Sequence, residues 1–397
     1  MRSNKKKINN ITFDIVVIGA GSSGIAFAAG FANTKIKIAV IDKMSNDLII
    51  NPKKDGREIA ITHNSEKILK DLKVWDLIPK KLISVIREAK VLDGDSSYFL
   101  NFNHQEIRKK NLGYLIPNHI IRKSLYKRLK KINNITLINK TECLSVNAEK
   151  NSSSIVLSNG KTIKTSLVVA ADGRFSKMRS KMGMSAFVRD FNKDMIVCRM
   201  KHEKPHHDTA YEFFRYNQTQ ALLPYIKNQS SIVTTTNKSS SSIFMKMNKK
   251  KFNKEMENSF NNSFGKMRLV GKRYSYPMVT TYTKKFISNR FVVIGDAAVG
   301  MHPVTAHGFN LALSGIEILI NEIKSSLKKG ADIGSAGVLR NYQSKLRRVA
   351  TPIYLTTNSI VNLYTSNIMP AKLARQFALR LANTIEPIKQ SFLNILK

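Results

Sequence analysis

Three short segments of the chain carry residues whose types and spacing could do chemistry, and the first combines three glycines with an aspartate. Gly19, Gly21 and Gly24 follow an apolar run and precede a stretch with helical spacing. Such glycines let backbone N–H groups approach a pyrophosphate at the positive end of a helix. Asp42 closes the next apolar run, where a carboxylate would accept hydrogen bonds from an adenosine ribose. The segment predicts an adenine nucleotide of the FAD or NAD type, and a tight turn without a ligand is the alternative.

The other two segments each place an acidic residue at the end of a predicted strand. Asp172 and Gly173 follow the apolar run 167–171, and Asp296 follows the apolar run 291–294. Ligands of parallel sheets bind at the C-terminal ends of the strands, so we expect the three segments to meet at one edge. The first motif alone fits FAD and NAD equally, and the addition of Asp172 and Asp296 favours FAD.

The loop after Asp296 contains glycine and histidine and leads into a helical pattern that begins near Gly308. Backbone N–H groups at the start of that helix could stabilise negative charge on the pyrimidine edge of a reduced flavin. His307 could donate a proton or a hydrogen bond there, because an imidazole changes charge near neutral pH. A structural hydrogen bond that closes the loop is the alternative role for His307, and we favour it.

Hydrophobic spacing predicts the elements that position these residues. Core strands are expected at 13–18, 36–41 and 291–294, and helices at 22–33 and 118–131, with Asn118 as N-cap. The strand, glycine turn, helix and strand near the N-terminus make a βαβ unit.

Short β segments between 195 and 282 predict a second sheet, and helices are expected over most of the chain from there to Lys397. Ser239 to Ser242 is expected to form a solvated hairpin turn between two strands of that sheet. We divide the chain into residues 1–184, 185–284 and 285–397.

Composition excludes several classes of protein. A chain of 397 residues can bury a large core and needs no staples. Cys143 and Cys198 have no spacing typical of a zinc site or a redox dithiol, which favours a reducing cytoplasm. His202, His206 and His207 are crowded together, but their spacing fits no metal site. We expect no metal and place these histidines in a solvated loop.

The chain is strongly basic, with 66 Lys and Arg against 27 Asp and Glu and a formal charge of +39. This charge favours contact with anionic lipid, nucleic acid or acidic proteins, and a general compositional bias is the alternative. No RNA-binding or zinc-finger motif accompanies it, so no specific nucleic-acid partner is expected. Because no apolar run approaches the roughly 18 residues of a membrane span, we expect a cytoplasmic protein, with peripheral contact to the inner face of a bacterial membrane as an option.

The order GAGSSG, AADGRF and GDAAVGMHPVTAHGFNLAL resembles the class A FAD-dependent monooxygenases. Within that family it is similar to the ubiquinone-biosynthesis hydroxylases of the UbiH/UbiF/VisC type, over nearly the whole chain. The UbiM branch is resembled in particular by segments 55–62, 113–119, 195–200 and 356–364. One departure is Ala306-His307-Gly308, where most UbiH-type relatives have Gly-Gln-Gly; the UbiM branch shares the change.

The resemblance implies a fold and a set of site residues. The fold is α/β, with a Rossmann-like FAD-binding domain of the glutathione-reductase kind, an inserted and mainly antiparallel β substrate domain, and C-terminal helices. By the family pattern the FAD-binding residues are Gly19, Gly21, Gly24, Asp42, Arg57, Arg122, Asp172, Gly173, Asp296, Gly308, Phe309 and Asn310. His302, Pro303 and His307 would form the catalytic face beside the flavin ring.

The resemblance also implies an activity. The expected reaction inserts one oxygen atom of O₂ into a prenylated phenol or quinol, demethoxyubiquinol by preference, through a C4a-hydroperoxyflavin. The reductant is either NAD(P)H bound transiently near Asp172 and Arg174 or another electron source. An anionic membrane surface, other ubiquinone-biosynthesis proteins and a second copy of the chain are the further partners considered. The alternative function is a non-catalytic, FAD-containing scaffold subunit of a quinone-biosynthesis complex.

Overall fold

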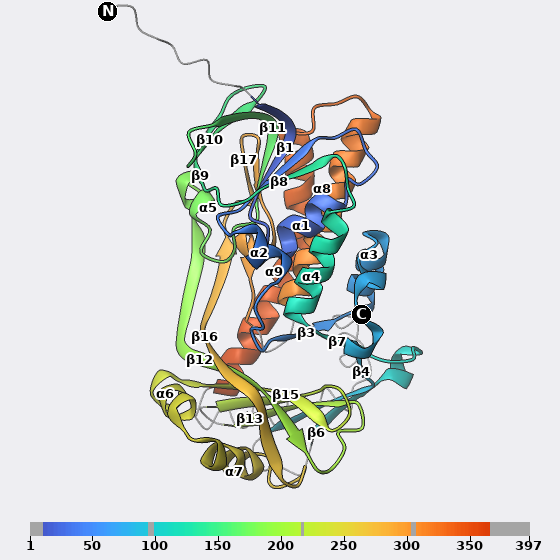
Figure 1. Cartoon of the computed structure of the whole chain (residues 1–397), viewed down its shortest axis with the longest axis vertical. Coiled ribbons are helices and arrows are strands. Elements are labelled where there is room, and N and C mark those ends of the chain that lie inside the picture. Colours follow the sequence, from blue (N-terminus) through green and yellow to red (C-terminus); the bar gives the residue numbers. More distant parts are fainter. Residues whose placement is uncertain (1–10, 94–98, 216–217, 303–306, 366–397) are drawn as a thin grey trace, which may run out of the picture.

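The computed structural model describes residues 11–93, 99–215, 218–302 and 307–365, which form two units joined by two long strands (Figure 1). The strands of the first unit are β1 (Ile11–Ile18), β2 (Ile38–Ile41), β8 (Ile135–Ile138), β9 (Cys143–Ala148), β10 (Ser153–Leu157), β11 (Thr162–Ala170), β17 (Ile287–Ser288) and β18 (Phe291–Val293). Their order is β17-β18-β11-β1-β2-β8, with β9 and β10 attached to β11. Strands β18, β11, β1, β2 and β8 are parallel to one another, as the βαβ prediction requires, whereas β17 and β10 pair antiparallel with β18 and β11.

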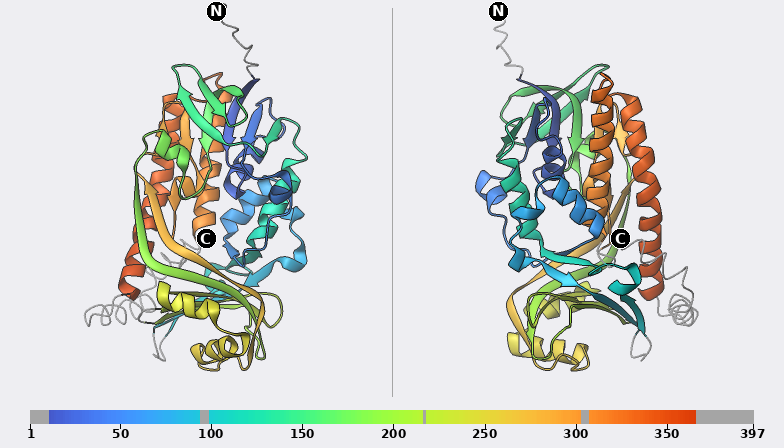
Figure 2. Two further views of the ribbon diagram at one scale, coloured as in Figure 1. Left: turned by 60° about the vertical axis from the view of Figure 1, so that its left-hand side comes forward. Right: turned by 90° about the vertical axis from the view of Figure 1, so that its right-hand side faces the viewer.

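These parallel strands are apolar along most of their length because helices and loops cover both faces of the sheet. All of β2 is buried, and Ile15, Val16 and Val17 of β1 have no exposed surface. The helices of this unit are α1 (Ser22–Ala29), α2 (Asn46–Ile50), α3 (His63–Asp71), α4 (Asn118–Leu129), α5 (Lys177–Lys181), α8 (Gly308–Lys328) and α9 (Ala336–Thr365). Helix α1 packs against α4 and α8, and α8 packs along α9, which Figure 2 shows in orange and red.

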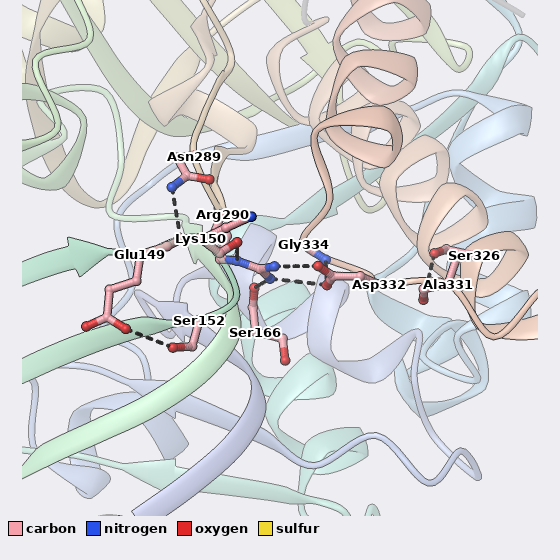
Figure 3. A network of polar contacts seen from close by, with 10 residues as sticks. All are labelled: Glu149, Lys150, Ser152, Ser166, Asn289, Arg290, Ser326, Ala331, Asp332 and Gly334. Atoms are coloured by element: carbon pink, nitrogen blue, oxygen red, sulfur yellow. Dashed lines mark hydrogen bonds and ion pairs between the residues drawn. The ribbon is translucent and has the colours of Figure 1, made fainter.

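Arg290 fixes β18 to the rest of the first unit at the end remote from the glycine motif (Figure 3). Its side chain is buried and donates to the carbonyl oxygens of Lys150 and Ser166. It also forms an ion pair with Asp332, whose carboxylate accepts from the backbone N–H of Gly334. The guanidinium therefore ties the β9–β10 hairpin, β11 and the α8–α9 loop to the start of β18.

The second unit is a mainly antiparallel sheet with the order β19-β16-β12-β15-β14-β13-β5-β6. Its strands are β5 (Glu88–Asp93), β6 (Phe99–Asn103), β12 (Ala186–His202), β13 (Thr209–Arg215), β14 (Gln218–Pro224), β15 (Gln229–Asn237), β16 (Met267–Thr283) and β19 (Val299–Gly300). A small sheet in the order β3-β7-β4 lies near it and consists of β3 (Glu58–Ile61), β4 (Ser84–Ile86) and β7 (Gly113–Pro117). The expected second sheet is confirmed.

Strands β12 and β16 are the long connection between the two units in Figure 1. They pair with each other antiparallel, and their register shifts between Asp190 and Asp194 and again between Val197 and Arg199. The sheet also takes in β5, β6 and β19, which lie outside residues 185–284. The division of the chain at 185 and 284 therefore stays a prediction about domains, while the sheet itself draws on a wider range.

The remaining helices lie mostly in loops or on the outer face of the second sheet. They are α6 (Lys238–Lys246), α7 (Lys249–Ser259), and the short 3-10 helices η1 (Trp75–Leu77), η2 (Lys80–Leu82), η3 (His104–Ile107) and η4 (Gly295–Ala297). Helix α9 contains Pro352. The expected C-terminal helices are confirmed as far as residue 365, and the rest of that prediction lies outside the described residues. None of the described helices is long and apolar enough to cross a membrane.

Three local predictions are wrong. Ser239 to Ser242 lies in helix α6, not in a hairpin turn, because the Asn237 side chain accepts from the N–H of Ser240 and caps a helix there. His202 and His206 are buried and hydrogen-bonded, not in a solvated loop.

The third wrong prediction concerns Asn118, which is the first residue of α4, whereas Pro117 occupies the N-cap position. The Asn118 side chain instead donates to Asp55 at 2.7 Å. An N-cap side chain must point back to the helix, and this one is held by a carboxylate outside it.

Candidate active site

The three predicted segments, with Asp42 counted apart from the glycine motif, supply four groups that follow neighbouring parallel strands. The structure brings these groups to one edge of the first sheet. The glycine motif follows β1, Asp42 follows β2, Asp172 follows β11 and Asp296 follows β18. Hydrogen bonds extend the pairing just beyond the strand ends, from Gly19 N–H to the Ile41 oxygen and from Ala171 N–H to the Ile18 oxygen. This is the edge at which parallel α/β sheets bind ligands.

The three glycines of the motif have different reasons to lack a side chain. Gly19 has a φ of +110°, and a Cβ there would lie 2.5 Å from the carbonyl oxygen of Ala171. A Cβ on Gly24 would lie 1.9 Å from the carbonyl oxygen of Gly19. Gly21, at the N-cap of α1, has no atom within 4 Å of its Cβ position. Gly19 and Gly24 thus permit close packing, and Gly21 leaves open space at the helix N-terminus that suits a pyrophosphate.

Asp42 is held in position by the glycine motif itself. One carboxylate oxygen accepts from the N–H of Ala20 at 2.7 Å, and the other accepts from the N–H of Met44 at 2.8 Å. A carboxylate has about four acceptor positions, so these two bonds orient the group and leave capacity for ribose hydroxyls.

Arg57 and Arg122 lie close to each other beside Asp55. Both Nε and Nη2 of Arg57 donate to Asp55, at 3.0 and 2.6 Å, and its guanidinium lies over the ring of Tyr276. Burial lowers the pKa of Arg122, which also interacts electrostatically with Asp55, Arg57 and Asp42. Among the described residues Arg122 has no hydrogen-bond or ion-pair partner. A half-buried cation of this kind, close to Asp42 and the glycine motif, suits the negative charge of a pyrophosphate.

Asp172 was expected to contact the cofactor, but its carboxylate makes hydrogen bonds within the protein. Its carboxylate accepts from the hydroxyl of Ser176 and from the N–H of Met178 at 3.1 Å, so it holds the start of α5. Gly173 beside it has a φ of +88° and no atom near its Cβ position. Contact of Asp172 with FAD or NAD(P)H stays a prediction, and the geometry gives the carboxylate a structural task.

Arg174 links Asp296 to the second sheet, a role that the sequence analysis missed. Its Nη2 donates to Asp296 and to the carbonyl oxygen of Met301, both at 3.2 Å, and its Nη1 donates to the carbonyl oxygen of Val279 on β16. A Cβ on Gly300 would lie 2.7 Å from Nε of Arg174. The side chain of Asp296 remains 42% exposed, so it is oriented by Arg174 and still open to a ligand.

Asn310 joins the start of α8 to β3. Its Nδ2 donates to the carbonyl oxygen of Ala60 at 2.9 Å, and its Oδ1 accepts from the N–H of Thr62 at 3.1 Å. Gly308 and Phe309 are the first residues of α8, and the buried His307 occupies its N-cap position. The N-terminus of a long helix is thereby fixed beside β3, where its N–H groups can face an anionic ring edge.

His302 is a buried imidazole next to the aromatic ring of Phe191, at a centroid distance of 5.0 Å. Burial, together with the cations Lys193, Arg174 and Arg189, lowers the pKa of His302 to about 3. His302 is therefore neutral at physiological pH. Pro303, its predicted partner on the flavin's working face, lies outside the described residues.

Three features fit an FAD molecule: the open space at Gly21, the oriented but accessible carboxylates of Asp42 and Asp296, and Arg122, which has no partner in the described part of the chain. The FAD binding domain family model matches residues 12–355. The chain belongs to this family. Within the residues that the structure describes, no group of three His, Cys, Asp or Glu side chains is placed to hold a metal.

Relatives within the family are similar over most of their length. The chain is 39% identical to the ubiquinone hydroxylase UbiM of Neisseria meningitidis, covering 95% of this chain and 83% of that protein. It is 29% identical to the ubiquinone hydroxylase UbiL of Rhodospirillum rubrum, covering 96% and 88%. The p-nitrophenol 4-monooxygenase PnpA of Pseudomonas putida has the same fold, with a TM-score of 0.78 at 14% identity, covering 96% and 97%. The protein is an FAD-dependent monooxygenase with the class A fold.

A second interaction that the sequence analysis missed joins the small sheet to the second sheet. Glu58 on β3 is almost fully buried and pairs with Arg199 on β12 at 2.5 Å, and it accepts from the hydroxyl of Ser231 on β15 at 2.6 Å. Arg199 also lies over the ring of Tyr225. Burial raises the pKa of Glu58 against the opposing effect of Ser231 and Arg199. The only sequence feature that could have drawn attention to this interaction is Glu58 itself, an acidic residue directly after Arg57.

Acid should destabilise the protein through His302. In the unfolded chain its pKa is near 6.5, so the unfolded state takes up a proton first as pH falls. The stabilisation is complete above pH 6.5 and is lost progressively toward pH 3. At pH 5 the expected loss is about 2 kcal/mol. Chemical unfolding at pH 7 and pH 5 would measure it, and His302→Gln should lose less stability over the same interval; an equal loss in both proteins would contradict the assignment.

Proposed function

We propose that this monooxygenase hydroxylates the ring of a prenylated phenol or quinol that is a precursor of ubiquinone, with demethoxyubiquinol as the favoured substrate. The names of UbiM and UbiL support this class of substrate. The observation that carries the proposal is an apolar cluster between the small sheet and the second sheet, close to β3. Its buried members are Ile86, Leu100, Phe102, Ile107, Leu112, Leu115 and Phe214. An apolar region beside β3, to which Asn310 ties the start of α8, suits a ring with a prenyl chain.

The predicted site residues keep their proposed roles toward FAD. Gly19, Gly21, Gly24 and Asp42 would hold the adenosine and pyrophosphate half, with Arg57 and Arg122 beside the pyrophosphate. Asp296 would bind the ribityl chain, and Gly308, Phe309 and Asn310 would lie at the flavin ring. FAD supplies the activation of O₂ and the oxygen transfer.

The chain's own residues would bind, orient and exclude water. Asn310 and Arg174 fix the two segments that would flank the flavin ring, and the second sheet would cover it. We place His302 at the working face and His307 at the start of α8; the predicted role of Pro303 falls outside the described residues. A neutral His302 adds no positive charge to that face, and its burial in contact with Phe191 helps to keep water out.

Two further partners remain proposals. NAD(P)H bound near Asp172 and Arg174 would compete with existing contacts, because Asp172 already accepts from the start of α5 and Arg174 already donates to Asp296. Contact with anionic lipid is supported by the exposed Phe187 on β12, which lies beside the cation Lys284, and vesicle flotation would test it.

Quinone profiling by mass spectrometry in a hydroxylase-deficient bacterium tests the function. The chain should restore the missing hydroxylated quinone, and the restored intermediate names the ring carbon. Asp296→Ala should lower FAD affinity and product by about tenfold or more, because a charge-assisted hydrogen bond is worth about 1.5–3 kcal/mol.

Asp332→Ala is the matched control, since Asp332 also pairs with an arginine but lies at the remote end of the sheet (Figure 3). It should lower stability and leave the FAD content of folded protein unchanged. If the wild-type chain restored no quinone, the proposed hydroxylase function would be contradicted. If the Asp296→Ala variant restored the quinone fully, the result would favour a non-catalytic scaffold.

A further inference from the structure

Glu212 on β13 places a carboxyl group in the middle of the second sheet. Its register partners are Ala221 on β14 and Val91 on β5. Partners in a sheet lie on the same face, so the row can be followed from strand to strand. Beyond Ala221 it continues through Val233, Val197 and Tyr274. Apart from Glu212 and Tyr274, every residue of this row is apolar.

Contacts establish which face of the sheet Glu212 occupies. Its neighbours along the strand, Tyr211 and Phe213, pack against Phe264 and Phe260, which follow α7, at ring distances of 5.5 and 5.4 Å. Side chains alternate along a strand, so Glu212 lies on the opposite face. On that face Tyr274 lies against the segment before β3, because a Cβ on Gly56 would lie 2.4 Å from its ring. Glu212 therefore faces the side on which the segment before β3 and the apolar cluster lie.

The surroundings of Glu212 provide no partner for its carboxyl group. Phe214 belongs to the buried apolar cluster, and Ala210 and Val91 pack against it. Within the described part of the chain, no hydrogen bond or ion pair is made by Glu212. Burial alone raises its pKa to about 8. The side chain nevertheless keeps part of its surface accessible, so packed atoms do not seal it.

A carboxyl group in such surroundings is unfavourable for stability. Its ionised form loses hydration without gaining a hydrogen bond or a cation, and an aliphatic residue would pack there without that penalty. Arg199 and Ser231 lie on the same face, two residues away from Val197 and Val233 along their strands. Unlike Glu212, both have a partner, because both hydrogen-bond Glu58. A half-buried carboxyl group that has a raised pKa and no partner among the described residues is typical of a ligand site.

Resting on the proposed function, we propose that Glu212 binds substrate by hydrogen-bonding a ring hydroxyl of the prenylated phenol, while the apolar cluster around Phe214 takes up the prenyl chain. A hydroxyl is the group of such a substrate that can donate to a carboxyl oxygen. The single polar contact would fix which ring carbon faces the flavin. Glu212 would therefore determine the site of hydroxylation as well as affinity.

The test compares two ligands that differ in one hydrogen-bond donor: 2-geranylphenol and its methyl ether. Binding to the oxidised, FAD-loaded enzyme is followed by the perturbation of flavin absorbance, which needs no turnover and no reductant. The wild-type protein should bind the phenol about 10–100-fold tighter than the ether. Glu212→Leu should bring the two affinities within about twofold, by weakening the phenol. Glu212→Gln, whose amide oxygen can still accept, should keep a preference for the phenol.

Glu255→Leu on the exposed face of α7 is the control for the substitution itself and should discriminate as the wild-type protein does. FAD content and the unfolding midpoint are measured for each variant, and the near-isosteric Glu212→Gln covers the case in which Glu212→Leu folds poorly. Undiminished discrimination in Glu212→Leu overturns the role of Glu212 and leaves the proposed function standing. A wild-type enzyme that binds neither ligand overturns the prenylated-phenol substrate and this inference with it.

Discussion

Replacing Gly24 with alanine should give a protein that no longer retains FAD and that unfolds more easily. The new Cβ would lie 1.9 Å from the carbonyl oxygen of Gly19, and 3.2 Å from a side-chain carbon of Val17. Both the carbonyl and the strand belong to the core of the first sheet, so neither can move away cheaply. Overpacking of this kind costs about 1–3 kcal/mol, and we expect the upper end. Urea unfolding of the apoprotein and the FAD content after purification are the measurements.

Gly21→Ala is the matched variant, because it makes the same chemical change three residues earlier. No atom lies within 4 Å of the new Cβ, and the backbone φ of −74° suits alanine. The apoprotein should therefore stay within about 1 kcal/mol of the wild-type stability, because the lower entropy of the unfolded chain offsets the poorer N-cap preference of alanine. FAD affinity should still fall, by about a hundredfold, because the methyl group would occupy the space proposed for the pyrophosphate. If both variants retained stoichiometric FAD, the cofactor could not lie at the N-terminus of α1.

Replacing Glu58 with leucine should lower the free energy of unfolding by about 3–5 kcal/mol, the usual effect of removing one member of a buried ion pair. The Glu58 side chain is only 1% exposed, and Arg199 would lose its carboxylate partner while remaining largely enclosed. Ser231 would lose its acceptor at the same time. Urea unfolding, monitored in both units, would show the loss.

The double variant Glu58→Leu, Arg199→Met distinguishes a lost charge pair from a loss of packing. Apolar side chains of similar volume can replace a buried ion pair at little cost, so the double variant should recover most of the stability. The two effects should therefore be strongly non-additive. Simple addition of the two single effects would show that the pair does not couple β3 to the second sheet.

The sequence was sufficient for the parts of the site that depend on neighbouring residues. The glycine spacing from Gly19 to Gly24, with an apolar strand before it and a helix after it, has one structural solution, and the positions of Asp42 and Asp296 follow from the parallel order of the strands. These patterns are local, because the strand, the turn and the ligand-facing residue lie next to each other in the chain.

Interactions between distant segments could not be predicted in this way. Glu58 and Arg199 lie on different sheets, and nothing near either residue indicates its partner. The same holds for Arg174, whose acceptors come from β16 and from the loop after Asp296. The wrong turn at Ser239 to Ser242 has a related cause. Serine favours turns in isolation, but Asn237 caps a helix there and Ser241 of that helix hydrogen-bonds Ser275 on β16.

Arg174 also bears on how freely the sequence can diverge. Two of its three acceptors are main-chain carbonyl oxygens, those of Val279 and Met301, and only the third is the side chain of Asp296. Any residue at positions 279 and 301 offers the same carbonyl group. The guanidinium therefore places no demand on those two side chains, which are buried and constrained by packing instead. The side chains on which these contacts themselves depend are Arg174, Asp296 and the small residue Gly300.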